Sequence, residues 1–216
     1  MNCPELREIK IPSTVKISDF YNQDINEASW FNGCTKLESV HLPSTLTTIP
    51  CWCFKNCTNL EYIQLKEGVI TIARGAFMNS GLKRISIPRS LLHLGDDYFP
   101  NMAGEVFKNC RHLKSVDLPE GLSCIACKTF KGCCRLESIV LPKSVDSIYE
   151  SAFRDCTSLT RVTIRCKHLC RIEPDAFHGC VHLRTIQASP AVLSLVLQKG
   201  MHHVGFLIVR TFFTIA

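Results

Sequence analysis

The chain of 216 residues repeats one pattern of hydrophobic and polar positions about every 23 residues. A phenylalanine marks each repeat, and the successive gaps between these phenylalanines are 23, 23, 30, 23, 23 and 24 residues. After each one come a small residue, a leucine and an alternation of apolar and polar residues that often ends in proline. The repeated phenylalanines are Phe31, Phe54, Phe77, Phe107, Phe130, Phe153 and Phe177.

One repeat shows which elements this pattern predicts. The segment from Leu37 through Val40 to Leu42 suits a short strand, and Pro43 directly after it ends the strand and turns the chain. Stacked repeats would place equivalent strands in parallel, about 4.8 Å apart. The rest of each repeat is predicted to hold turns, a second short extended piece and a 3₁₀ turn near the phenylalanine. A period of 23 is too short for paired-helix repeats.

Each repeat alone cannot bury its apolar positions, so we expect a stack of coils with one continuous core. Leucines should lie over leucines, and phenylalanines over phenylalanines. Residues 1–190 form the predicted array of about eight coils, with insertions at 18–30 and 95–106. Because no capping segment precedes Cys3, we expect the chain to be part of a longer array.

The apolar residues 191–216 interrupt the repeat after Pro190. We predict that they form a cap over the last coil, since solenoids need capped ends for solubility. A membrane-seeking tail and a truncated repeat are the alternatives. The segment at 205–216 contains Arg210 and is too short to span a bilayer.

Three stretches resemble a known repeat family: CTKLESVHLPSTLTTI from residue 34, CRHLKSVDLPEGLSCI from residue 110 and CTSLTRVTI from residue 156. They resemble the BspA-like, or Treponema pallidum type, leucine-rich repeat, and the resemblance covers residues 3–187. It implies a repeat solenoid of the leucine-rich repeat class, an α/β-type right-handed superhelix with one short parallel strand in each coil. It also implies a protein-binding or adhesive role.

Fourteen cysteines are unusual for this length, and half of them occupy one position of the repeat. We interpret this column as a structural ladder of small side chains whose weak donors satisfy turn carbonyls. Ser80 fills the same position in one coil, and a serine cannot form a disulfide. A buried thiol in an apolar turn is also inert, which argues against redox chemistry. The predicted ladder consists of Cys3, Cys34, Cys57, Ser80, Cys110, Cys133, Cys156 and Cys180.

Two other groups of cysteines superficially suggest a metal site. Cys124 and Cys127 form half of a zinc knuckle, but no second half follows at knuckle spacing. Cys166, His168 and Cys170 precede His178, Cys180 and His182, but half a coil separates the two groups. The repeat should therefore send them to opposite edges, and we predict neither a metal site nor a cofactor.

Composition and charge exclude several other functions. The chain is 46% hydrophobic and carries a net charge of +6, with basic residues scattered rather than clustered as in a nucleic-acid-binding arm. No nucleophile motif, phosphate loop or metalloprotease motif is present, so we expect no enzyme. Without a signal peptide or an apolar run of membrane-spanning length, we expect a cytoplasmic or other reducing intracellular compartment. The cell surface is the alternative if the chain is a fragment.

The candidate binding residues lie on the predicted strand face and in the two insertions. On the strands, Tyr62, Arg84 and Arg161 are the residue types that dominate binding hot spots. Each insertion holds three acidic residues with aromatic rings and no lysine or arginine, which suits a basic partner with apolar pockets. Alternatively, the rings fold back onto the coil edge. The insertion candidates are Phe20, Tyr21 and Trp30, then Asp96, Asp97, Tyr98 and Phe99, beside the acids Asp19, Asp24, Glu27 and Glu105.

The sequence therefore predicts a non-enzymatic protein-interaction module with a protein partner of unknown identity. A surface adhesin fragment is the first alternative, and a cysteine-based metal-binding protein is the second.

Overall fold

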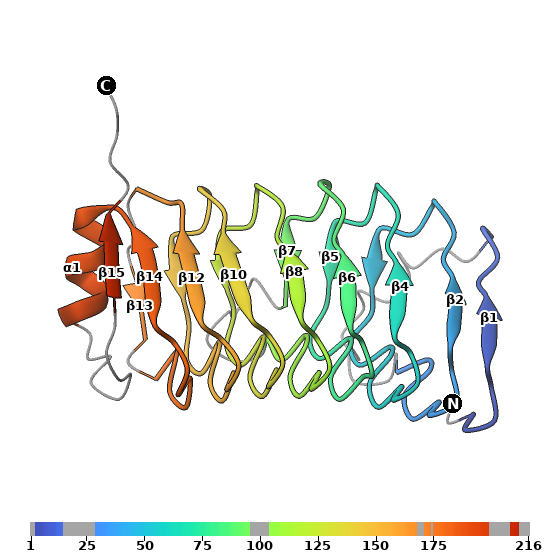
Figure 1. Cartoon of the computed structure of the whole chain (residues 1–216). Helices are drawn as coiled ribbons and strands as arrows, with labels where there is room; N and C mark the ends of the chain where they lie inside the picture. The colour runs from blue at the N-terminus through green and yellow to red at the C-terminus, as the bar shows by residue number, and fades with distance from the viewer. Residues whose placement is uncertain are drawn as a thin grey trace.

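The computed structural model describes residues 3–14, 29–95, 104–167, 171–173, 175–198 and 208–211. These residues form a stack of coils in which short parallel strands line two sides (Figure 1). The predicted repeat solenoid is confirmed. Most coils contribute one longer strand and one two-residue strand, so the predicted second extended piece is a strand as well.

The longer strands form the surface that we call the front sheet. All of its strand pairs are parallel, and equivalent residues of neighbouring coils face each other, as Ile63 faces Ile85 and Val162 faces Ile186. A hydrogen bond from the Glu137 N–H to the Lys114 carbonyl continues the ladder from the residue before β8 to the residue before β10. The strands are β1 (Glu8–Lys10), β2 (Ser39–His41), β4 (Tyr62–Gln64), β6 (Arg84–Ser86), β8 (Ser115–Asp117), β10 (Ser138–Leu141), β12 (Arg161–Ile164), β14 (Thr185–Ala188) and β15 (Ile208–Thr211).

The two-residue strands form a second parallel surface that we call the back sheet. The apolar second residue of each strand is buried, as in Ile49 and Ile125. The pairs run β3–β5–β7 and β9–β11–β13. These strands are β3 (Thr48–Ile49), β5 (Thr71–Ile72), β7 (His93–Leu94), β9 (Cys124–Ile125), β11 (Ser147–Ile148) and β13 (Arg171–Ile172).

A column of stacked phenylalanine rings runs through the coils, as the sequence predicts. Neighbouring ring centroids from Phe31 to Phe177 are separated by 5.1 to 5.7 Å, and the ring planes deviate by 5 to 17°. The rings from Phe54 to Phe153 are fully buried. Backbone hydrogen bonds hold the coils at this spacing, because the Phe54 N–H donates to the Ala76 carbonyl at 2.7 Å and equivalent bonds recur in other coils.

The second insertion departs from the coil over a shorter stretch than 95–106. Gly104 accepts a hydrogen bond from the Gly75 N–H at 3.0 Å, and Glu105 donates its N–H to Cys127 at 2.9 Å, so both occupy ordinary coil positions. A Cβ on Gly95 would lie 3.0 Å from the Cα of Gly104, which shows that the two ends of the insertion meet. Gly104 has no room for a side chain either, because a Cβ there would lie 2.6 Å from the Cys127 carbonyl oxygen.

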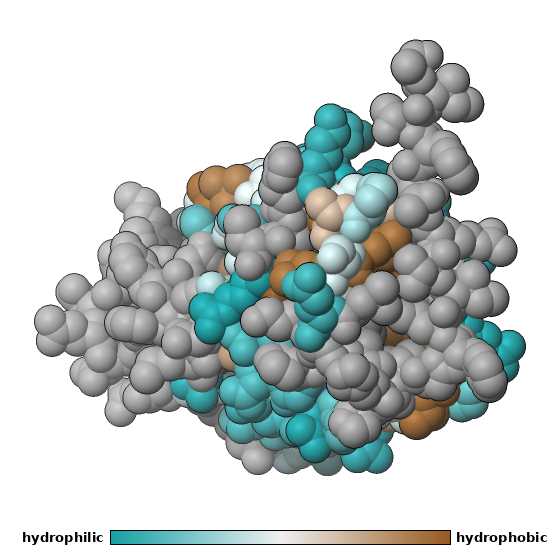
Figure 2. Space-filling view, turned by 90° about the vertical axis from the view of Figure 1, so that its left-hand side faces the viewer, coloured by the Kyte–Doolittle hydropathy of each residue, from teal (hydrophilic) through white to brown (hydrophobic). Residues whose placement is uncertain are grey.

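The segment after the last longer strand begins with a helix, α1 (Pro190–Gln198). Proline suits the first helical position, and the Ser189 hydroxyl accepts a hydrogen bond from the Val192 N–H at 3.4 Å as an N-cap. Val192, Leu193 and Val196 are buried against the end of the array, and β15 pairs in parallel with β14. Figure 2 views this end, where hydrophobic and hydrophilic described residues both reach the surface.

Candidate functional site

Two rows of side chains point outward from the front sheet, because alternate residues of a strand face opposite sides. In β4, β6 and β8 the first and third residues are exposed and the middle residue is buried. The first row reads Glu8, Ser39, Tyr62, Arg84, Ser115, Ser138, Arg161 and Thr185. The second reads Lys10, His41, Gln64, Ser86, Asp117, Val140, Thr163 and Gln187.

Charged side chains in the first coils of this face are paired with one another. Arg7 lies 3.0 Å from Glu38, and His41 lies 3.1 Å from Glu8. In the next coils Lys83 pairs with Glu61 at 2.7 Å. These exposed pairs contribute little to stability, but they neutralise most of the charge around β1 to β4. Lys10 in β1 has no ion pair to another described residue.

An aromatic ring and an arginine stand together where this paired region ends. The Tyr62 ring is 48% exposed, and the Arg84 guanidinium lies over it at 5.9 Å from the ring centroid. Stacking on a ring restricts the guanidinium and leaves its N–H donors free for a ligand. Both residues are binding candidates from the sequence, and the structure places them on adjacent strands.

Towards β14 the exposed cations of the front sheet have no carboxylate within ion-pair distance in the described part of the chain. They are Lys114 before β8, Arg161 in β12 and Arg184 before β14. Asp117 and Glu137 are the exposed acids among them. The front sheet is therefore electrostatically uneven, with a neutralised region at one end and solvated cations at the other.

The contacts of two predicted insertion residues, Trp30 and Glu105, lie within the described ranges. Trp30 is half-buried, packs against the core and meets Phe31 edge-on at 6.3 Å between centroids, so this ring folds back onto the coil edge. Glu105 is not an uncompensated acid, because its carboxylate lies 2.6 Å from Lys108 and 3.7 Å from Arg74. The remaining candidates lie outside the described residues: Phe20, Tyr21, Asp96, Asp97, Tyr98 and Phe99, with Asp19, Asp24 and Glu27.

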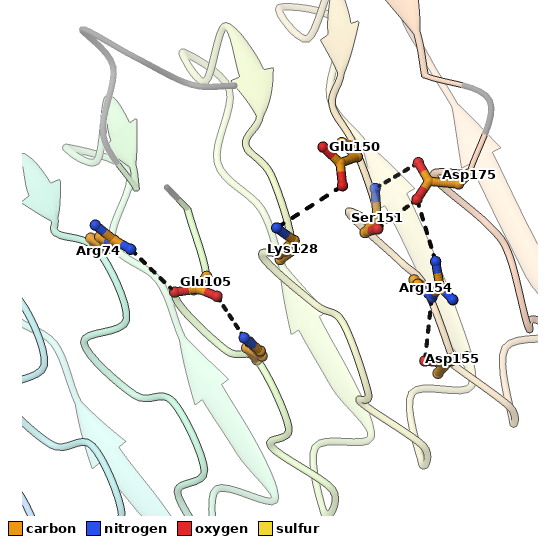
Figure 3. A network of polar contacts seen from close by, with 9 residues as sticks. Arg74, Glu105, Lys128, Glu150, Ser151, Arg154, Asp155 and Asp175 are labelled. Atoms are coloured by element: carbon orange, nitrogen blue, oxygen red, sulfur yellow. Dashed lines mark hydrogen bonds and ion pairs between the residues drawn. The ribbon is translucent and has the colours of Figure 1, made fainter. Parts of the chain in front are cut away.

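Glu105 belongs to a set of polar contacts along one edge of the coils (Figure 3). Burial opposes its ionisation, but the hydrogen bond and charge of Lys108, together with Arg74 and Lys128, outweigh burial and lower the pKa of Glu105. Its backbone φ of 51° lies in the left-handed region, so the contacts compensate a strained conformation. The residue anchors the return of the second insertion to the array.

The same edge continues in the later coils with Asp175 at its centre. The Ser151 hydroxyl and N–H donate to this carboxylate at 2.7 and 3.1 Å, and Arg154 lies 3.6 Å away. Burial again opposes ionisation, while the hydrogen bonds from Ser151 and the charge of Arg154 lower the pKa of Asp175. The contacts of Glu105 with Arg74 and of Asp175 with Ser151 and Arg154 cross between coils, so this edge joins coils to one another.

The cysteine column lies in the turn after the phenylalanine stack. A thiol of this column donates a hydrogen bond to the phenylalanine carbonyl of the preceding coil, for example from Cys133 to Phe107 at 3.2 Å. The same bond, at 3.0 to 3.2 Å, is made by Cys57, Cys110, Cys133, Cys156 and Cys180. In the serine-bearing coil the Ser80 hydroxyl lies 3.3 Å from the Cys110 sulfur.

The thiols of this column are poorly suited to nucleophilic chemistry. Burial raises the pKa of Cys57 and of Cys110 to about 12 and raises the pKa of Cys133 well above its ordinary value. Within the described ranges the cysteines form no disulfides. Because the thiolate is the reactive form, the buried Cys57, Cys110 and Cys133 should react slowly in the folded protein. Cys3, at the start of the column, is exposed.

A second column, between each phenylalanine and the next cysteine, escaped the sequence analysis. Every residue two positions after a repeated phenylalanine has a φ between 58 and 78°. The residues are Gly33, Asn56, Asn79, Asn109, Gly132, Asp155 and Gly179. Only glycine, asparagine and aspartate occur there, which are the types that tolerate this conformation. That restricted choice of residue is the sequence signal that could have revealed the column.

The asparagines of this column hydrogen-bond along the stack. The Asn79 amide donates to Asn56 at 2.8 Å, and Asn109 donates to Asn79 at 3.1 Å. Where the ladder ends, a Cβ on Gly132 would lie only 2.3 Å from the Asn109 side-chain oxygen. The column therefore satisfies its own polar groups and is structural.

The suggested metal ligands do not converge where they can be followed. Cys180 is committed to the Phe153 carbonyl, and His182 Nδ1 lies 2.6 Å from the carbonyl of Thr157. His168 and Cys170 lie outside the described residues. Within the described ranges, no group of three or more histidine, cysteine or acidic side chains is arranged to hold a metal ion.

Within the described residues, no helix has the length and apolar character needed to cross a bilayer.

Parallel strands on coils of about 23 residues, a leucine core and stacked phenylalanines define a leucine-rich repeat protein. The model of the BspA type leucine-rich repeat region matches residues 1–104 and 101–196, with six copies. The chain belongs to the BspA-type leucine-rich repeat family. No curated protein sequence matches it.

Solved structures of bacterial leucine-rich repeat proteins share this fold. A protein from Bacteroides ovatus matches with a TM-score of 0.64 at 24% identity, over 98% of this chain and 53% of that chain. A leucine-rich cell surface protein from Faecalibacterium prausnitzii matches with a TM-score of 0.53 at 21% identity, over 85% and 60%. The leucine-rich repeat protein of T. pallidum matches with a TM-score of 0.52 at 28% identity, over 59% and 58%. The chain thus spans about half the length of the first of these relatives.

Proposed function

We propose that this chain is a non-enzymatic protein-binding module whose front sheet contacts a protein partner. The observation that carries the proposal is the group of exposed residues on β4, β6 and β12. Tyr62 is stacked beneath Arg84, and Arg161 on the same row makes no ion pair with another described residue. Tyrosine and arginine are enriched at the centres of protein interfaces, where they dominate the binding energy.

The rigidity of the face supports this role. Its outward residues are held on strands whose middle residues are buried, such as Ile85 and Val116 at 4% and 5% exposure. A rigid surface loses little conformational entropy on binding, so the contacts that it makes contribute more fully to affinity. The extended surface of a solenoid is also the type of surface that repeat proteins commonly use to bind.

The front sheet also carries an exposed apolar residue within its polar rows. Val140 in β10 is 40% exposed and lies beside Thr163 in the second row. Together with Tyr62 it provides apolar contact area, and the serine hydroxyls of the first row provide adaptable hydrogen bonding. Tyrosine, serine and arginine at rigid positions resemble the composition of evolved binding surfaces.

The two insertions remain a second candidate contact. Their candidate residues lie outside the described ranges, apart from Trp30 and Glu105, whose contacts lie at the coil edge. The cell surface is the alternative location if the chain is a fragment, and one structural relative is described as a cell surface protein. Fractionation of cells that produce the natural protein, probed with an antibody, tests the location directly.

A bulky substitution at the centre of the front sheet tests the proposed binding face. We expect Ser138→Trp to fold normally and to abolish partner capture, because the indole would stand between Arg84 and Arg161. Thr47→Trp is the matched control, since Thr47 is exposed beside β3 of the back sheet. Partners should be captured by cross-linking from the natural source and quantified by mass spectrometry against both variants. Equal loss in both variants, or in neither, contradicts a binding face on the front sheet.

A further inference from the structure

We propose that the front sheet recognises an acidic polypeptide segment in extended conformation, with Arg84 and Arg161 as its two carboxylate-binding groups. This inference rests on the proposed function and names the chemistry of the partner. Arg84, Lys114, Arg161 and Arg184 are exposed cations on or beside the strands from β6 to β14, and no ion pair to another described residue occupies them.

The contrast with the first coils makes these cations informative. Around β1 and β2, Arg7 and Lys36 pair with acids at 3.0 and 2.6 Å, so the fold neutralises most of the charge there. Lys10 is the exposed cation of these strands that has no ion pair to another described residue. The rows of β8 to β14 instead place serine and threonine beside the arginines: Arg161 is flanked by Ser138 and Thr185 in the strand register. Carboxylates from another chain can reach these guanidinium groups without displacing an internal partner.

The strand register sets the distance between the two arginines. Arg84 faces Ser115, and Ser138 faces Arg161, so the arginines are three strand spacings apart along one row. At about 4.8 Å for each spacing, this separation is about 14 Å. An extended peptide rises about 3.4 Å per residue, so carboxylates four residues apart span the same distance and point to the same side.

The residues between the arginines form a floor suited to a peptide. Ser115 and Ser138 are small, so the longer arginine side chains stand above them, and their hydroxyls can donate to or accept from a peptide backbone. Tyr62 restricts Arg84 by stacking at 5.9 Å. A guanidinium binds a carboxylate through two parallel N–H donors, which makes the contact sensitive to geometry as well as charge.

The acids on the same face argue against a continuous polyanion. Asp117 lies in β8, and Glu137 directly precedes β10, so both interrupt the positive surface between the two arginines. A nucleic acid or a sulfated polysaccharide would bring anionic groups close to these carboxylates and be repelled. A peptide with two spaced carboxylates and neutral residues between them avoids that repulsion.

Synthetic peptides test the spacing. Three fluorescein-labelled peptides would be built from serine, threonine and valine. The first carries two glutamates four residues apart, the second carries two glutamates two residues apart, and the third carries glutamines in place of the glutamates. They would be titrated to millimolar concentration with the full chain and followed by fluorescence anisotropy. We expect the four-residue spacing to bind about tenfold more tightly than the two-residue spacing, with binding weakened by salt. Equal binding by all three peptides, or no binding, overturns the inference.

Arginine variants test the two named contacts. Arg84→Gln and Arg161→Gln should each lower the affinity for the peptide with four-residue spacing about tenfold, because each removes one charge-assisted contact. Arg165→Gln is the matched control, since Arg165 is exposed but lies beyond the end of β12 and outside both rows. It should leave the affinity unchanged. An equal loss of peptide affinity in all three variants would indicate a general charge effect. It would overturn the inference that Arg84 and Arg161 bind the two carboxylates.

Competition separates the inference from other anions and from the proposed function. Heparin and single-stranded DNA would be compared with unlabelled glutamate peptide as competitors, at equal concentrations of negative charge. If either polyanion displaces the labelled peptide more effectively, the front sheet is a general polyanion surface and the inferred acidic-peptide partner is wrong. If no peptide binds while Ser138→Trp still abolishes capture of a natural partner, the front sheet remains the binding face and only the acidic partner is wrong. If Ser138→Trp leaves capture intact, the proposed function itself fails.

Discussion

Replacing Cys133 tests whether the cysteine column is a buried ladder of weak donors. The residue is fully buried, and its thiol donates to the Phe107 carbonyl at 3.2 Å. A leucine removes this bond, which costs about 0.5–1.5 kcal/mol, and adds two heavy atoms to a filled site, which costs about 1–3 kcal/mol. Together the expected loss for Cys133→Leu is about 2–4 kcal/mol.

Cys133→Ser is the matched variant, because a hydroxyl is a similar size and retains the donor. Ser80 already occupies the equivalent position in another coil and is 3% exposed. We expect Cys133→Ser to lose less than about 1.5 kcal/mol, within the range for a conservative buried change. For a chain of this length each kcal/mol shifts the melting temperature by about 2–4 °C, so the leucine variant should melt about 4–16 °C, and the serine variant less than about 6 °C, below the natural protein.

Urea denaturation followed by circular dichroism measures the difference. The denaturation slope should stay constant, so that a shift of the midpoint reports stability rather than a change in the unfolded state. Ser80→Cys completes the comparison and should be nearly neutral. Equal stability of the leucine and serine variants would refute a packed polar ladder at this position, and the column would then need another explanation.

Three further predictions concern the second insertion, the Glu105 contacts and the C-terminal segment. Deleting residues 96–103 should join Gly95 to Gly104 with little change in melting temperature, because these residues already meet; a large loss of stability would contradict this account of the insertion. Glu105→Gln should destabilise the protein at pH 7, because the carboxylate pKa is lowered from 4.5 on folding. That contribution is present above pH 4.5 and is lost as pH falls through the lowered pKa, so the melting temperatures of the two proteins should converge in acid below pH 4.5. Ending the chain at Pro190 should remove α1 and β15, expose the edge of β14 and cause aggregation visible by light scattering, whereas a stable monomer would show that the segment is not a cap.

Much of the coil could be predicted because the sequence repeats itself. A stack buries equivalent positions against each other, so an apolar residue that returns every 23 positions must lie in the same column as its copies. Phe54, Phe77 and Phe107 follow this rule despite the longer gap before Phe107, and their rings stack at 5.4 and 5.7 Å. The periodicity therefore predicted the core and the parallel strands.

The insertion at 95–106 shows where such reasoning stops. The longer gap between Phe77 and Phe107 indicates that this coil contains additional residues. The gap does not distinguish the residues that leave the coil from those that occupy ordinary coil positions. Glu105 looks like a loop acid in the sequence, yet its N–H bonds to Cys127 and its carboxylate bonds to Lys108. Those contacts join residues three to 22 positions apart, and they depend on how neighbouring coils align.

The binding candidates divide in the same way. The period-two alternation of a strand determined from sequence that Tyr62, Arg84 and Arg161 face outward. Whether each cation meets an acid was decided only by the register of neighbouring coils and by side-chain rotamers. Charge pairing depends on distances of a few ångströms between atoms far apart in the sequence. The repeat alone thus determined the solenoid and its faces, and the tertiary structure decided which charges on the front sheet remain available to a partner.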